Sequence, residues 1–459
     1  MAVWLLMSVA AVAICIAAWW FYTRRLDWRF RHIESYLRGL STKPKVNRTA
    51  GKPIMRQLYK ILNTSITTGK SADAYQALDL LKLALGHGLA RVGEPVRLTA
   101  SIYLALRSNQ LDAAGHAIDA FRPLLKNMTA AELPAAIEQL GLIAVVSLKQ
   151  RKNFLAARAV EVIFTNTGIL KDETVHMAFI RAIRLIGLIA LRRKDDGLIR
   201  EIQANLAGWL ATETTDGSIH EQVAGIISAW LHQVVKTGNV AMFAIITQYV
   251  KQLADKKMLS AKALENIVAE CIHLASMDSL NPFSQLNGQI AMFSLDLAVQ
   301  ARNINVWRQS LGGAMQASRL AVTQRTLAES FPVVYPLLET GRRLLVAELN
   351  SGPMNDLFRQ KALYILIREC LQLVEFVSRQ NFTATAADII EQIYQEWASC
   401  QSNAGQHKSI KRFCQLLFLY CVRIKRRHKR LPGEESEFNA ENVISTAERE
   451  HLKKIGYLS

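Results

Sequence analysis

Gly69-Lys70-Ser71 is the stretch that most resembles a chemical motif, because a phosphate-binding loop ends in the same residue types. Such a loop also needs a glycine five residues before its Gly-Lys pair and a strand upstream, so that backbone N–H groups can surround the phosphates. Thr64 stands at that glycine position, and the residues before it have a helical pattern. The sequence therefore favours a helix–helix turn here over nucleotide binding.

Glu270 and His273 are spaced three residues apart on one predicted helix, which is a spacing that metal-binding carboxylate–histidine pairs use. The pair has no second copy, so a surface pair is favoured over a metal site. No HExxH or GxSxG motif occurs, and the ten histidines are scattered. We therefore predict no catalytic residue, no cofactor and no metal ligand, and we expect that the chain is not an enzyme.

A basic run near the C-terminus is the clearest unusual feature, with six cations in eight residues: Arg423, Lys425, Arg426, Arg427, Lys429 and Arg430. The dipole at a helix C-terminus accounts for one or two such charges. An anionic lipid surface, a nucleic-acid backbone or the acidic segment from Glu434 to Glu441 could be the partner. The run lacks the interleaved aromatics of single-strand binders, so we predict contact with lipid or another anionic partner.

The net charge and the cysteine content limit which partners and which cellular compartment are plausible. Lysine and arginine number 56 against 38 acidic residues, giving a net charge of +18. Such a surplus points to an anionic partner and carries no information about the fold. The six cysteines, Cys15, Cys271, Cys370, Cys400, Cys414 and Cys421, form no CxxC pair. Their scatter argues against a disulfide framework or a zinc site and fits a reducing compartment.

The N-terminal segment has the properties of a transmembrane anchor. Ala2 to Tyr22 is a run of 21 residues without a charge, and a helix of that length spans the roughly 30 Å hydrocarbon core. Four aromatics close the run, as in an interfacial belt. Basic residues follow it and none precedes it; the first are Arg24, Arg25, Arg29 and Arg31. By the positive-inside rule we predict a single-pass protein of the inner (cytoplasmic) membrane, with its N-terminus outside and its C-terminal domain in the cytoplasm.

Two other interpretations of this segment are weaker. A cleaved signal peptide needs a positive start, a short apolar core and a small-residue cleavage site, whereas this run starts uncharged, is long and ends in aromatics. A buried core helix does not explain arginines at one end only. After the anchor (1–22), residues 23–39 are predicted to form a basic amphipathic helix at headgroup level, with Trp28, Phe30, Ile33 and Leu37 among the arginines. A polar linker completes the region 23–53.

From residue 54 to residue 430 the sequence predicts helix after helix and no strand. Apolar residues recur at spacings of three and four, as in Leu111–Leu125, Glu173–Leu191 and Ala261–Leu274. Short breakers separate the segments, such as Ser108-Asn109, Lys152-Asn153, Asp195-Asp196-Gly197 and Thr237-Gly238-Asn239. Trp209 and Trp230 have apolar neighbours and are expected in the core. Residues 431–459 are polar and are predicted to form a tail.

The breakers recur at a constant spacing. Residues at or just after them are Leu111, Phe154, Gly197, Val240 and Phe283, each 43 residues from the last. Two helices with turns fill such a period, which lies in the range of HEAT and armadillo repeats and above that of tetratricopeptide repeats. We therefore predict an all-α chain whose anchor is followed by a helical-repeat solenoid. A non-repeating bundle with helices of similar length is the alternative.

Three functional hypotheses remain at this point. A membrane-anchored cytoplasmic adaptor, binding an unknown protein partner, is favoured because a solenoid offers a long surface. This plan resembles, in outline only, membrane-tethered adaptors of bacterial envelope assembly, and the analogy identifies no partner. A membrane-tethered nucleic-acid-binding protein is the second hypothesis, and an enzyme with a site formed only in three dimensions is the third.

Overall fold

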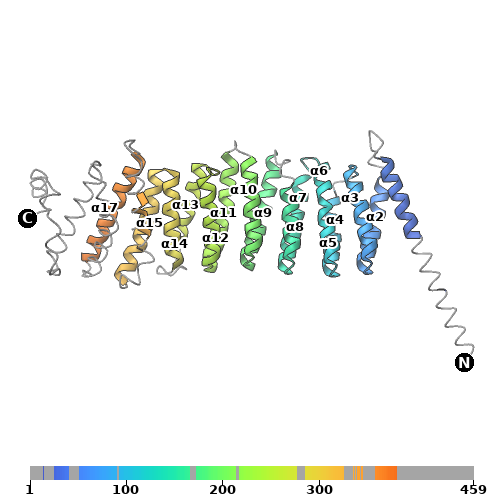
Figure 1. Cartoon of the computed structure of the whole chain (residues 1–459), viewed down its shortest axis with the longest axis horizontal. Coiled ribbons are helices and arrows are strands. Elements are labelled where there is room, and N and C mark those ends of the chain that lie inside the picture. Colours follow the sequence, from blue (N-terminus) through green and yellow to red (C-terminus); the bar gives the residue numbers. More distant parts are fainter. Residues whose placement is uncertain are drawn as a thin grey trace, which may run out of the picture. The chain divides into compact units, whose positions relative to one another are not determined.

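The computed structural model describes residue 14, residues 25–40, 51–89, 93–165, 172–212, 217–275, 285–324 and 357–379, and residues 334, 336, 337, 339–341, 343 and 344. The described residues contain helices and turns and no strand, which confirms the predicted all-α class (Figure 1). The chain divides into two compact units, Met1–Thr212 and Glu213–Ser459. Each unit is a succession of antiparallel helix pairs.

In unit 1 the first helices of the pairs form one layer and the second helices form another. The first helices are α2 (Lys52–Thr67), α4 (Glu94–Arg107), α7 (Leu133–Lys149) and α9 (Glu173–Arg193). The second helices are α3 (Ser71–Gly86), α5 (Leu111–Asp119) with α6 (Phe121–Asn127), α8 (Asn153–Phe164) and α10 (Asp196–Thr212). Each helix packs on its own partner and on its counterpart in the next pair. No pair buries its apolar face alone, which is the physical basis of a repeat fold.

Unit 2 continues the same alternation. Its first helices are α11 (Gly217–Thr237), α13 (Ala261–Ala275), α15 (Ile304–Gln324) and α17 (Leu357–Arg379), and its described second helices are α12 (Val240–Asp255) and α14 (Gln285–Ala301). Trp230 and Trp307 are fully buried in this unit. Trp209 of unit 1 is 3% exposed, so both tryptophans that the sequence assigned to the core, Trp209 and Trp230, lie there.

The predicted period is confirmed, and it lengthens by one residue from each repeat to the next. The second helices α5, α8, α10, α12 and α14 begin at residues 111, 153, 196, 240 and 285, so successive starts are 42, 43, 44 and 45 residues apart. Four of the five sequence markers fall within one residue of these starts. The fifth, Phe283, lies outside the described residues.

The turn inside each pair is built in the same way five times. At each turn one residue adopts a left-handed conformation: Gly69, Asn109, Arg151, Lys194 and Gly238. The next backbone N–H then bonds the carbonyl five residues back, as Lys70 does to Ser65 (2.9 Å) and Lys152 does to Ser147 (2.8 Å). This is the Schellman motif, which satisfies helix-terminal carbonyls. Gly69-Lys70-Ser71 is therefore a helix–helix turn, as the sequence favoured.

The side chains at these turn positions should set local stability. A left-handed residue with a Cβ costs about 1–2 kcal/mol, and glycine avoids that cost. We therefore expect Lys194→Gly to raise the free energy of unfolding by about 1 kcal/mol. Gly238→Ala should lower it by a similar amount, because a Cβ at Gly238 meets no atom within 4 Å and only backbone strain changes. Urea titrations of the two variants measure both effects, and equal signs would contradict this account.

Side chains also connect neighbouring pairs by bonding exposed helix-end carbonyls. Gln110 Nε2 donates to the Ile66 carbonyl of α2 (2.9 Å), and Arg193 Nη2 donates to the Lys149 carbonyl of α7 (3.1 Å). Asn127 Nδ2 donates to the Leu85 carbonyl of α3 (2.9 Å). Each bond spans 42 to 44 residues, which is the repeat period. Carbonyls without intrahelical partners therefore fix the register between pairs.

Two predicted boundaries need correction. The segment Leu111–Leu125 was expected to be one helix, but it is divided at Ala120 into α5 and α6. Pro123 explains the division, because it lacks an N–H and its ring would clash with the carbonyl of residue 119. Lys52 and Pro53 were assigned to the linker, yet they open α2, where proline is tolerated in the first turn.

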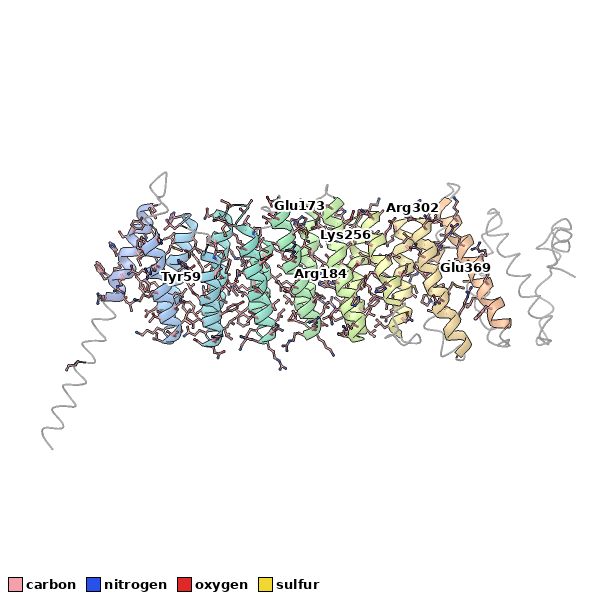
Figure 2. All side chains as sticks on the ribbon, turned by 180° about the vertical axis from the view of Figure 1, so that it is seen from behind. Tyr59, Glu173, Arg184, Lys256, Arg302 and Glu369 are labelled. Carbon is pink, nitrogen blue, oxygen red and sulfur yellow. The ribbon has the colours of Figure 1, made fainter. Side chains whose placement is uncertain are left out.

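Residues 25–40 form a helix that lies beside α2 and runs antiparallel to it in both views (Figures 1 and 2). Its apolar face is buried in the protein through Leu26, Phe30, Ile33, Leu37 and Leu40. Phe30, Ile33 and Leu37 are therefore covered by the protein itself and are not available to the headgroup region. Trp28 alone of the four apolar residues named from the sequence is exposed, at 64%, and it stacks on His32.

One described helix, α9, is long and apolar enough to cross a membrane, but 61% of its apolar window is buried. It packs between α7 and α10, so its length and hydropathy reflect a core position. The predicted anchor at residues 1–22 lies outside the described residues except for Ile14.

Candidate functional site

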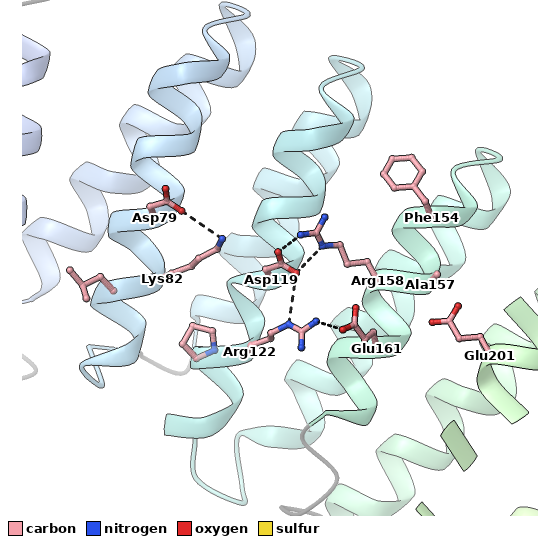
Figure 3. A pocket seen from close by; sticks show the side chains of 11 residues that line it. Asp79, Lys82, Asp119, Arg122, Phe154, Ala157, Arg158, Glu161 and Glu201 are labelled. Atoms are coloured by element: carbon pink, nitrogen blue, oxygen red, sulfur yellow. Dashed lines mark hydrogen bonds and ion pairs between the residues drawn. The ribbon is translucent and has the colours of Figure 1, made fainter. Parts of the chain in front are cut away.

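An open groove crosses the second helices of unit 1 (Figure 3). We call it the second-helix groove. The side chains that line it come from α3, α5, α6, α8 and α10, and they are Asp79, Lys82, Leu83, Asp119, Arg122, Pro123, Phe154, Ala157, Arg158, Glu161 and Glu201. An open groove of this kind suits an extended protein segment better than a small molecule, which enclosed pockets bind.

Asp119 is the centre of an ion-pair network in the groove. Arg158 of α8 holds its carboxylate in a bidentate pair, with Nε 2.8 Å from Oδ1 and Nη2 on Oδ2. Arg122 lies 3.9 Å from the same carboxylate and 2.8 Å from Glu161 Oε1. The bond to Asp119 raises the pKa of Arg158. Planar bidentate pairs of this type have defined geometry, so the network gives the groove a rigid charged floor.

Gly115 leaves the room that the Arg158 side chain needs to reach Asp119. A Cβ at this position would lie 3.0 Å from Arg158 Nη1 and 3.5 Å from Leu155 Cδ2. The Arg158 guanidinium therefore occupies space that a larger residue at position 115 would fill. The glycine thus serves side-chain packing between neighbouring repeats.

The carboxylates of the groove recur once in each repeat. Asp79, Asp119, Glu161 and Glu201 stand 40, 42 and 40 residues apart, one on each successive second helix. The sequence did not single out any of them. Asp79, Asp119 and Glu161 each lie eight residues after the start of their helix and Glu201 lies five after, so aligning the helix starts would have placed three of the acids in one column and the fourth about one turn away.

Glu201 differs from the other three acids. Asp79 is 3.7 Å from Lys82, and Asp119 and Glu161 are paired with arginines, whereas no cation of the described residues pairs with Glu201. Burial and the nearby charges of Glu161 and Asp195 raise the pKa of Glu201. The groove therefore holds one carboxylate whose charge no described cation compensates.

Apolar side chains are exposed beside these charges. Phe154, at the start of α8, is 51% exposed, and Leu83 of α3 is 38% exposed. Exposed aromatics flanked by arginines are the residue types that carry most binding energy at protein interfaces. The sequence pattern had identified Phe154 only as a marker of the repeat period.

The residues predicted to contact anionic partners are only partly described. Arg25, Arg29 and Arg31 lie on the helix of residues 25–40, with Arg25 and Arg31 exposed and Arg29 half-buried. Arg24 and all six cations of the basic run (Arg423, Lys425, Arg426, Arg427, Lys429 and Arg430) lie outside the described residues. Their predicted contacts therefore remain predictions.

The other sequence candidates have structural partners. Glu270 Oε1 lies 3.2 Å from His232 Nδ1, so this acid joins α13 to α11. Within the described parts of the chain, no group of three or more His, Cys, Asp or Glu side chains could hold a metal ion. Cys271 and Cys370 are buried free thiols, and burial raises the pKa of each.

No protein-family model matches the chain, and no curated protein matches it. Among solved structures, a circular tandem repeat protein with novel repeat topology and enhanced subunit contact surfaces is 12% identical, with 84% of this chain and 99% of that chain covered and a TM-score of 0.34. An engineered protein is 12% identical over 86% of this chain and 98% of its own, with a TM-score of 0.26. A computationally designed self-assembling cyclic homo-oligomer is 14% identical over 80% of this chain and 99% of its own, with a TM-score of 0.15. Scores this low carry no argument, so the assignment to a helical-repeat fold rests on the helix pairs and turns themselves.

Proposed function

We propose that this protein is a membrane-anchored scaffold that binds another protein in the second-helix groove. The observation that carries the proposal is the combination of half-exposed Phe154 with the uncompensated carboxylate of Glu201 in one open groove. Leaving both groups unsatisfied costs free energy that a partner would recover. The groove holds four carboxylates and three cations, which makes it a poor match for a phosphate backbone.

The partner's chemistry follows from the same two residues. It should bring a lysine or arginine to Glu201 and an apolar side chain over Phe154. A cation beside Glu201 would lower the pKa of that carboxyl, so the partner and the ionised carboxylate stabilise each other. Binding is therefore expected to weaken as the pH falls and Glu201 becomes protonated.

Variants of the groove test the docking proposal. Phe154→Ala with Glu201→Lys should reduce recovery of the bound protein from native membranes by about tenfold or more, because it removes an aromatic anchor and reverses a charge. Quantitative mass spectrometry of material captured with the full-length chain provides the measurement.

The matched control changes one exposed apolar residue and one glutamate on the first-helix layer. Leu142 and Glu138 are exposed on α7, so Leu142→Ala with Glu138→Lys makes the same charge change and also removes exposed apolar area. The control should leave recovery unchanged. A groove variant that captures the same proteins in the same amounts as the wild type would refute docking at this site.

The anchor is the second element of the proposed function. Residues 1–22 are proposed to span the inner membrane once, with residue 23 onward in the cytoplasm, because the uncharged run is followed by arginines. The full-length protein should resist alkaline carbonate extraction, and deletion of residues 1–22 should make it extractable. Reporter fusions after residue 50 should report the cytoplasm. A periplasmic signal, or full extraction of the intact chain, would disprove the anchor.

A further inference from the structure

One edge of unit 1 carries a concentration of cations where first helices end and second helices begin. We call this the turn edge, and six of its cations are Arg107, Lys149, Arg151, Lys152, Arg193 and Lys194; Lys70 and Arg192 lie on it as well. Of the six, five are exposed and Lys152 is half-buried. Asp73, Asp112, Asp195 and Asp196 share the edge, and each lies at the start of a second helix, where an acid complements the helix dipole. The edge retains a positive surplus.

These six cations form no ion pair with any residue that the structure describes. None of them forms a salt bridge with a carboxylate of the described residues, whereas Arg122 and Arg158 in the groove both do. Arg193 bonds only a backbone carbonyl, which leaves its charge uncompensated.

Two of the cations occupy backbone positions that disfavour them. Arg151 and Lys194 have φ values of 62° and 58°, where two sibling turns use glycine. Lys257 and Arg302 adopt the same conformation at turns of unit 2, so the conformation is not peculiar to this edge. The concentration of cations that form no ion pair with described residues is what distinguishes the edge.

The helix of residues 25–40 begins at the turn edge, directly after the proposed anchor. Because it is antiparallel to α2, its first residue lies at the edge where α2 ends, which is the turn edge (Figure 1). Glu173, which begins a first helix, lies at the opposite edge (Figure 2). Exposed Arg25, Trp28 and Arg31 are within the first two turns of this helix. The proposed anchor ends three residues before Arg25.

We propose that the turn edge of unit 1 rests on the anionic headgroups of the membrane, so that the helices of this unit stand on the bilayer. This inference rests on the proposed anchor, which would hold the turn edge within about one Debye length of the lipid surface. Cations at that distance are attracted to anionic lipid, and the attraction falls as salt rises. Exposed Trp28 beside Arg25 fits the interfacial zone, where tryptophan is favoured.

The orientation has a consequence for the second-helix groove. The groove is lined by side chains of α3, α5, α6, α8 and α10, most of which lie along the helices; Phe154 alone lies beside a turn of the turn edge, at the start of α8. A unit standing on its turn edge therefore keeps the groove open sideways to the cytoplasm. A bound partner would be held parallel to the membrane.

The test uses the full chain reconstituted in phosphatidylcholine vesicles with and without phosphatidylglycerol. A fluorescent amino acid is placed at exposed Asn153 on the turn edge or at exposed Ala130 on the opposite edge. Nitroxide-headgroup lipids should quench the probe at residue 153 about threefold or more above the probe at residue 130 in anionic vesicles at low salt, and the difference should shrink with salt.

Two charge variants decide whether the cations cause the contact. Neutralising the edge with Arg107→Gln, Lys149→Gln, Arg151→Gln, Lys152→Gln, Arg193→Gln and Lys194→Gln should abolish the difference. The control removes six exposed cations elsewhere in unit 1, with Lys52→Gln, Arg56→Gln, Lys60→Gln, Lys126→Gln, Arg181→Gln and Arg184→Gln. It should preserve the difference, and circular dichroism should give the same helicity for both variants.

The outcomes separate this inference from the anchor. If the chain inserts into vesicles but quenching at residues 153 and 130 is equal, the turn edge does not contact lipid and the anchor stands. If the chain fails to insert, the anchor itself is wrong, and with it the inference. Unchanged quenching in the edge variant, together with loss of its retention on duplex DNA, would assign the cations to nucleic acid and overturn the lipid contact.

Discussion

Trp307→Ala is expected to lower the free energy of unfolding of unit 2 by about 3–5 kcal/mol, because it empties a fully buried site. The indole of Trp307 on α15 has no exposed surface, and its Nε1 donates to the Ala362 carbonyl of α17 at 3.1 Å. The substitution therefore removes both packing and a buried hydrogen bond between two first helices. Since whole domains are stable by only about 5–15 kcal/mol, the loss should be visible as local unfolding.

Hydrogen exchange distinguishes a repeat array from one cooperative body. In a repeat array each pair is stabilised mainly by its neighbours, so protection should fall in α15 and α17 and stay unchanged in α2 to α8. Trp28→Ala is the matched control, because Trp28 is 64% exposed and its loss should change stability by less than about 0.5 kcal/mol. A uniform loss of protection in both units after Trp307→Ala would contradict independent repeat behaviour.

The pairing of helices was predictable because its determinants are local. Each turn forms within about six residues, and breakers such as Asn109 and Gly238 are visible in the sequence as polar or flexible residues. Arg151 and Lys194 are poor left-handed residues, and their turns were found only because Asn153 and Asp195-Asp196 follow them. The break at Ala120 was missed because Pro123 sits inside a strong apolar pattern.

The groove was not predictable in the same way, because its contacts connect different repeats. Arg158 and Asp119 are 39 residues apart, and nothing near either residue identifies the other as its partner. Their meeting depends on the register between α5 and α8, which packing sets, and on the space that Gly115 leaves. Side-chain exposure could not be predicted from the sequence either. Phe154 and Phe179 are the same residue type, and only the fold leaves the first exposed and the second buried.

Gly141→Leu is expected to destabilise unit 1 by about 3 kcal/mol, because α7 and α9 meet at this glycine without room for a side chain. A Cβ at Gly141 would lie 3.0 Å from Ala182 Cβ and 3.5 Å from Ala182 Cα. The second atom belongs to the backbone of α9, so no rotamer change relieves the contact and the two helices must separate. Protection in hydrogen exchange should fall in α7 and α9, while α13 and α15 keep theirs.

Two further variants show whether the close approach is the cause. Gly208 lies on an exposed part of α10, where a Cβ meets no atom within 4 Å, so Gly208→Leu should stabilise unit 1 slightly through helix propensity, by about 0.5–1 kcal/mol. Gly141→Ala should cost less than Gly141→Leu, and Ala182→Gly should recover part of that cost in the double variant, since residues in contact couple by about 0.5–3 kcal/mol. If the double variant is merely the sum of its two single variants, the contact between residues 141 and 182 does not limit the packing of α7 on α9.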